Sequence, residues 1–191
     1  MGGAMSLVLF GSTSGSVTLQ EPAVAGTTVL DLPATSGTVL TSASQSIPKA
    51  ALPTGSVLQV VSVTKTDAFT SSATGAFTDI TGMSASITPT SASSRILVIV
   101  SSTLYSSSAS WGSIATVYRN GSDIASSTSA GVLFYGDATG WAKCATTVLD
   151  SPASTSSLTY QLFLKSQNSG TNVGANRNST RNSIVLMEIA G

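Results

Sequence analysis

Apolar and polar residues alternate along most of the chain after residue 55, and the runs are short. Ala76–Ile80 and Met83–Ile87 each alternate, and Pro89 ends the second run. A period of two puts the apolar side chains of a strand on one face. Similar strand-like segments recur at spacings of about ten to fifteen residues, namely Val57–Val63, Arg95–Tyr105, Ser113–Tyr118, Val132–Tyr135, Trp141–Leu149, Leu158–Lys165 and Ser183–Ile189. The pattern predicts an all-β domain of the β-sandwich or jelly-roll-like kind.

One turn is marked by its own residues. Asn120-Gly121 stands between two strand-like runs, and both residue types tolerate the positive φ that a two-residue hairpin turn requires. We therefore predict a β-hairpin at this position.

Two of the predicted strands are apolar without interruption. Ile96–Val100 and Ile184–Met187 show no alternation, which indicates strands covered on both faces. In a β-sandwich of this size, one face of each sheet normally lies on the solvent side. Another subunit is the simplest way to cover an apolar outer face, and a loop of the same chain is the alternative. We predict a homotrimer in which the following residues lie at the core or the subunit interface: Ile96, Val98, Val100, Ile184 and Leu186.

The first quarter of the chain repeats with a period of eleven residues, seen at Gly15, Gly26 and Gly37 and again at Pro22 and Pro33. Each unit is a short β-branched and leucine-rich run followed by a proline and a glycine, which predicts strand and turn in succession. Such a ribbon is marginally stable alone, so we interpret residues 1–44 as an attachment arm. Residues 45–55, with two prolines, are predicted as a linker, and residues 56–191 as a knob. The predicted anchoring residues of the arm are Gly15, Val17, Leu19, Pro22, Gly26, Leu30, Pro33 and Gly37.

The arm also resembles a segment common in bacteriophage tail-fibre and other virion surface proteins. The resemblance is carried by Thr13–Ala23 and by Leu32–Leu40, and more loosely by a Ser/Thr-rich β domain ending in Ile184–Gly191. It implies a non-enzymatic, often trimeric protein on the exterior of a phage virion, with other virion proteins as partners. Host attachment as a tail fibre or spike is the first interpretation, and a capsid decoration (cement) protein is the alternative.

Composition excludes several classes of chemistry. The chain has no histidine, and its eight basic and eight acidic residues are scattered, so we predict neither His-dependent catalysis nor a nucleic-acid partner. No apolar run approaches the length of a membrane-spanning helix, and no cofactor-binding or metal-binding motif occurs. Only 8% of residues are charged while 41% are hydrophobic, and the mean hydropathy is +0.32. This balance favours a densely packed assembly over a free monomer. The single Cys144 is predicted as a small buried hydrophobe.

Two groups of residues are candidates for recognition. Aromatic residues stand beside glycine-flanked turns, and a polar segment rich in asparagine precedes the last strand. Either group suits a host surface glycan, and the polar segment also suits a neighbouring protein. Core aromatics and a solvated loop are the simpler interpretations. The candidate contacts are Trp111, Tyr135, Trp141, Asn172, Arg177 and Arg181. A polysaccharide depolymerase using two of Asp79, Asp123 and Asp137 is the weakest alternative.

Overall fold

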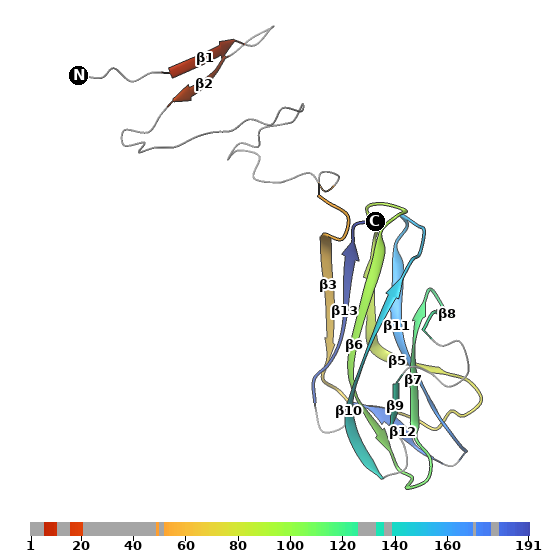
Figure 1. Cartoon of the computed structure of the whole chain (residues 1–191). Helices are drawn as coiled ribbons and strands as arrows, with labels where there is room; N and C mark the ends of the chain where they lie inside the picture. Colours follow the sequence, from red (N-terminus) through yellow and green to blue (C-terminus); the bar gives the residue numbers. More distant parts are fainter. Residues whose placement is uncertain are drawn as a thin grey trace. The chain divides into compact units, whose positions relative to one another are not determined.

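The computed structural model describes residues 6–10, 16–20, 49, 52–125, 133–135, 139–169, 171–176 and 180–191 (Figure 1). The chain divides into two compact units, Met1–Ser46 and Ile47–Gly191. In the first unit β1 (Ser6–Phe10) pairs antiparallel with β2 (Ser16–Gln20), so that Leu7 lies opposite Leu19. Of the predicted anchoring residues, Val17 and Leu19 belong to β2, and the other six lie outside the described residues.

The second unit consists of two antiparallel sheets that pack face to face (Figure 1). The six-stranded sheet has the order β3-β13-β6-β12-β4. β13 and β12 pair with successive parts of one edge of β6, and β10 pairs with its opposite edge. Its strands are β3 (Val57–Lys65), β4 (Phe69–Ser71), β6 (Arg95–Ser106), β10 (Gly140–Asp150), β12 (Val173–Ala175) and β13 (Asn182–Ile189).

The second sheet has the order β5-β11-β7-β8, and β9 also pairs with β7. Its strands are β5 (Thr78–Ile87), β7 (Ser113–Arg119), β8 (Ser122–Asp123), β9 (Leu133–Tyr135) and β11 (Leu158–Ser166). No α-helix occurs in the part of the chain that the structure describes. The all-β prediction is therefore confirmed.

The core lies between the two sheets and is filled by alternate residues of the long strands. In β11 every second residue is buried, from Leu158 to Ser166. In β6 the residues Ile96, Val98 and Val100 are 0% exposed, as are Ile184 and Leu186 of β13. All five residues assigned to the core or subunit interface therefore face the core, because a period of two sends them to one side of the sheet.

The uninterrupted apolar runs place other residues on the outer face of the six-stranded sheet. Leu97 and Ile99 of β6, and Val185 and Met187 of β13, point away from the core and are half-buried. These four are the ones that a second subunit could reach.

The predicted hairpin is confirmed. Asn120 and Gly121 have φ values of 49° and 84°, and they connect β7 to β8 with Arg119 paired to Ser122. Both φ values are positive, as the favoured two-residue turn requires.

The boundaries of other elements differ from the prediction. Ala76–Ile80 and Met83–Ile87 were expected as two strands, but residues 78–80 and 83–87 belong to the single strand β5, which passes through Gly82 at φ 85°, and Ala76 and Phe77 precede it. The register with β11 shifts there, since Gln161 pairs with Ser84 and Phe163 with Asp79. Glycine permits this bulge because it has no side chain to strain.

The polar segment before the last strand is also more ordered than expected. It contains β12, whose Val173, Gly174 and Ala175 are all buried between β6 and β4. The solvated-loop interpretation is therefore wrong for these residues. Strands of three residues are too short to show a period, so β4 and β12 arise from tertiary pairing.

The second unit has two distinct ends along its strands. At the entry end the first and last segments are joined, since Gly55 N donates to Ala190 O (2.8 Å) and Ala190 N donates to Ser56 O (2.8 Å). The opposite, distal end carries the β6–β7 loop and the start of β10 (Figure 1).

Candidate functional site

A row of four residues crosses the outer face of the six-stranded sheet at the distal end. Trp141 of β10 lies opposite Tyr105 of β6, Tyr105 lies opposite Gly174 of β12, and Gly174 lies opposite Thr70 of β4. Trp141 is 50% exposed and Tyr105 is half-buried. Neighbouring side chains in such a row are about 5 Å apart at Cβ, so the two aromatic residues form one continuous surface.

Gly174 brings β4 close to β12. A Cβ at this position would lie 2.4 Å from the carbonyl oxygen of Phe69, so only glycine fits beside β4. Next to this row is a hollow of about 390 Å³, which we call the distal hollow. It is lined by Thr70, Ser71, Ser72, Tyr105 and Asn172.

Asn172 is held in place by its backbone rather than by its side chain. Its N–H donates to Ser107 Oγ (2.9 Å), and its carbonyl oxygen accepts from Ser107 N (2.9 Å). Its neighbours Thr171 and Val173 are buried. Within the described residues the side-chain amide of Asn172 has no hydrogen-bond partner, and this side chain is exposed. A fixed backbone thus presents an amide group with both donors and an acceptor.

Of the predicted contact residues that the structure describes, Asn172 lines this hollow, and Trp141 lies beside it opposite Tyr105. Trp111 is 42% exposed in the β6–β7 loop, where its carbonyl oxygen accepts from Ser106 Oγ (2.5 Å). Arg181 is exposed, and its carbonyl oxygen accepts from Lys143 Nζ. Tyr135 lies in β9 opposite Ser113, with its side chain outside the described part, and Arg177 lies outside the described residues.

Trp141 and Asn172 were predicted as contacts from the sequence, whereas Tyr105 and Thr70–Ser72, which the structure places near them, were not. Tyr105 and the segment Thr70–Ser72 belong to strands distant in sequence and carry no motif. Gly174 is the one feature of the sequence that could have indicated this site. A glycine between two apolar residues in a short strand marks a close approach of another backbone.

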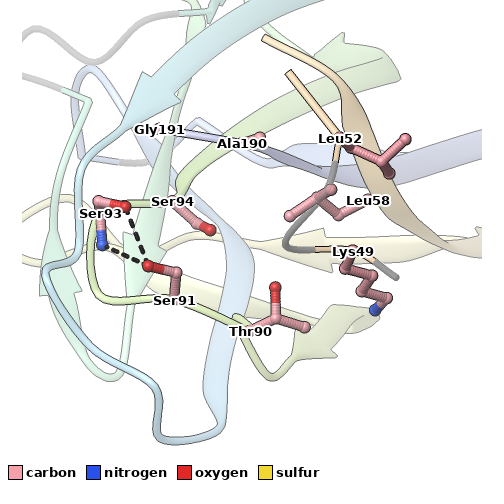
Figure 2. A pocket seen from close by; sticks show the side chains of 9 residues that line it. All are labelled: Lys49, Leu52, Leu58, Thr90, Ser91, Ser93, Ser94, Ala190 and Gly191. Carbon is pink, nitrogen blue, oxygen red and sulfur yellow. Dashed lines mark hydrogen bonds between the residues drawn. The ribbon is translucent and has the colours of Figure 1, made fainter. Parts of the chain in front are cut away.

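A second hollow of about 390 Å³ lies at the entry end (Figure 2). Its lining combines residues 49–58, the turn before β6 and the end of the chain, and the residues are Lys49, Leu52, Leu58, Thr90, Ser91, Ser93, Ser94, Ala190 and Gly191. Several of its polar groups are already engaged. Ser91 Oγ and Ser93 Oγ are 2.9 Å apart, as the dashed lines in Figure 2 show, and Thr90 and Ser94 bind Glu188. We therefore interpret this hollow as part of the structural framework.

Glu188 is the buried carboxylate that organises this end. Its Oε1 accepts from Thr90 N (2.6 Å), Thr90 Oγ1 (2.7 Å) and Ser94 Oγ (2.8 Å), and its Oε2 accepts from Gln59 Nε2 (2.6 Å). Burial by itself raises the pKa of Glu188, but these hydrogen bonds outweigh it and hold the pKa below its ordinary value. Glu188 is 0% exposed and charged, and its role is structural.

A cluster of three polar side chains joins the two sheets near the same end. Arg119 Nη1 donates to both carboxylate oxygens of Asp150 (2.8 and 2.7 Å), and the Tyr160 hydroxyl donates to Asp150 Oδ2 (2.7 Å). Burial and then the Asp150 carboxylate raise the pKa of Tyr160, so this hydroxyl remains a donor at physiological pH. The group ties β7 and β11 of one sheet to β10 of the other.

Cys144 lies in β10 opposite Ser102 and packs, half-buried, against the core. Burial raises the pKa of its thiol, which lowers the fraction of reactive thiolate. Among the described residues no cluster of three or more His, Cys, Asp or Glu side chains could hold a metal ion.

Nearer the entry end, the outer face of the six-stranded sheet is apolar. Leu149, Leu97, Met187 and Val60 form one row across β10, β6, β13 and β3, and the next row contains Ile99 and Val185. We call these six residues the apolar zone. Val60 is 54% exposed and Leu149 is 51% exposed. The two rows carry no charged residue, because their other members are Thr147 and Ser62.

No protein-family model matches the chain, and no curated protein matches it. In the described part, no helix is long and apolar enough to cross a membrane.

Proposed function

We propose that this chain is a non-enzymatic structural protein on the surface of a bacteriophage particle. Its first unit is the arm that anchors it, and its second unit is a trimeric knob that acts in host attachment as a tail fibre or spike. The observation that carries the proposal is that the two ends of the second unit differ. The chain enters and leaves this unit at one end (Figure 1). The exposed Trp141 and the distal hollow lie at the other end.

The knob is proposed to be a jelly roll. With β4, β8 and β12 left out as additions to the pattern, the sheets have the orders β3-β13-β6-β10 and β5-β11-β7-β9. Successive strands change sheet at every step except β7 to β9, and the first and last strands are neighbours. This order supports a double Greek key, which is the defining arrangement of jelly rolls.

The trimer is proposed to form through the apolar zone. Exposed apolar surface of this extent marks interaction sites. A second copy of the chain is the occupant that the surface favours, because an uncharged face meets its own copy without charge repulsion. The jelly-roll and trimer proposals together match the arm's resemblance to virion proteins.

The strand order argues against the depolymerase alternative. Asp79 lies in β5 and Asp123 in β8, at opposite edges of one sheet with β11 and β7 between them. Three strand spacings amount to about 14 Å, whereas paired glycosidase carboxyl groups lie about 5–9.5 Å apart. Asp123 is also engaged by Thr116 Oγ1 (2.9 Å) and Ala125 N (3.0 Å). Asp137 lies outside the described residues.

The test is to restore the protein to particles that lack it. Full-length chain and a chain without residues 1–44 are each added to such particles, which are then sedimented and imaged with a gold label. The full-length chain should co-sediment and label the tail. The truncated chain should remain soluble and rich in β structure but stay in the supernatant, because the second unit retains its own core.

Each other outcome has a defined meaning. Label over the head would replace host attachment with capsid decoration. If the truncated chain co-sediments as well as the full-length chain, the arm is not the anchor. If neither chain binds particles, the proposed function is wrong.

A further inference from the structure

We propose that the distal hollow, with Trp141 beside it, is a binding site for a neutral glycan. The proposal rests on the proposed function, since it names the site and the ligand class by which the knob would attach to a host surface. One sugar ring would occupy the hollow against Tyr105, and the next ring would lie over Trp141.

The chemistry of the lining suits a sugar. A pyranose ring presents an apolar face of C–H groups and a rim of hydroxyl groups, so it needs a flat aromatic surface together with hydroxyl or amide partners. The hollow supplies Tyr105 as the aromatic surface. Its polar groups are those of Thr70, Ser71, Ser72 and Asn172.

The lining of the distal hollow carries no charge among the described residues, and this favours a neutral ligand. All five lining residues among those described are uncharged. An anionic group inside the hollow would lose hydration without gaining an ion pair from the lining, whereas neutral hydroxyl groups can exchange water for the lining hydroxyls and amide. The site therefore favours neutral over acidic glycans.

Strand pairing and hydrogen bonds hold the residues around the hollow in place. Tyr105, Gly174 and Thr70 are in register across three paired strands. Asn172 is fixed by two backbone hydrogen bonds to Ser107, and Ser71 Oγ accepts from Ala73 N (3.1 Å). A ligand would meet groups that are already in place, which lowers the entropy cost of binding.

The hollow is also separate from the apolar zone on the same face. The row through Trp141 and Tyr105 is the distal end of the β10–β6 pairing, and the row through Leu149 and Leu97 is close to its entry end. Between them the face carries Lys143, whose Nζ donates to the carbonyl oxygen of Arg181, and small polar residues such as Ser101 and Ser183. Subunit contact near the entry end thus leaves the distal row available.

The test is isothermal titration of the full-length chain with neutral hexasaccharides of glucose, galactose and mannose. An oligosaccharide containing sialic acid serves as the anionic comparison. At least one neutral probe should bind and the anionic probe should not. Trp141→Ala and Asn172→Ala should each weaken binding about tenfold or more, as expected when a main contact is truncated.

Trp111→Ala is the matched control, because Trp111 is similarly exposed but lies in the β6–β7 loop, outside both the lining and the row that contains Trp141 and Tyr105. It should bind like the wild type. Circular dichroism and light scattering should show the same fold and mass for all three variants, since each replaced side chain is exposed.

Three results would overturn the site. One is that no neutral probe binds the wild-type chain. Another is that the Trp141 and Asn172 variants bind as tightly as the Trp111 variant. The third is that Trp141→Ala changes the oligomeric mass, which would make the distal row a contact between copies. Failure of the proposed function is distinguishable, because the chain would then bind sugar without joining phage particles.

Discussion

Glu188 is a buried carboxylate whose ionisation affects the stability of this fold. Its pKa in the folded chain is lowered from the usual value of about 4.3 for an unfolded glutamate. A carboxylate with a depressed folded pKa contributes stability above its unfolded pKa, and this contribution is lost as the pH falls through the folded value. The free energy of unfolding should therefore drop as the pH is lowered below about 4.3.

Glu188→Gln tests this assignment at pH 7. Glutamine can still accept from Thr90 and Ser94, but its amide nitrogen would face the donating Gln59 Nε2. We expect a loss of about 1–3 kcal/mol in the free energy of unfolding, measured by urea titration at fixed chain concentration. The difference from wild type should shrink at pH 3.

Asp79→Asn is the control, because Asp79 is exposed and has no hydrogen bond to its side chain within the described residues. Its stability should match the wild type at both pH values. Equal acid sensitivity of wild type and Glu188→Gln would show that Glu188 is not the responsible group.

At the scale of the element, the β7–β8 hairpin depends on the conformation of one glycine. Gly121 has φ 84°, and a Cβ added there would meet nothing within 4 Å. Gly121→Ala therefore creates backbone strain without a clash and should cost about 1 kcal/mol. Thermal or urea unfolding measures this loss.

Gly75→Ala is a matched comparison, since a Cβ at Gly75 also meets nothing within 4 Å but its φ is not in the left-handed region. This variant should be neutral or slightly stabilised, because alanine reduces the conformational freedom of the unfolded chain. If the two variants lose the same stability, the positive φ of Gly121 is not what the turn requires.

At the scale of the whole molecule, the apolar zone should determine the oligomeric state. Light scattering of the full-length chain should give three chain masses at micromolar concentration. Val60→Lys should shift the mass towards the monomer while preserving the β-sheet spectrum, because Val60 is 54% exposed in the isolated chain and a charge there opposes association.

Ser86→Lys is the control for the added charge. Ser86 is exposed on β5, in the other sheet, and this variant should keep the trimer mass. A monomeric wild type would contradict the trimer directly. A trimer that persists in Val60→Lys would move the interface to a different surface.

The sequence alone determined the class of structure and much of its local geometry. Alternation of apolar residues predicted the long strands, because side chains in a strand point to opposite faces with a period of two. Asn120-Gly121 predicted its hairpin, because few residues adopt positive φ. The apolar runs at Ile96–Val100 and Ile184–Met187 marked strands with apolar side chains on both faces. Each of these signals is contained within about ten neighbouring residues.

Only the tertiary structure decided which residues meet. The distal hollow joins Thr70, Tyr105 and Asn172, which come from three separate parts of the chain. The lateral order of the strands brings them together, and that order depends on the packing of the whole core rather than on any local pattern. The same reason explains why β4 and β12 were missed and why the sequence left open whether the five residues lie in the core or at the subunit interface. The sequence of a strand shows which residues share a face. The arrangement of the whole fold determines what that face contacts.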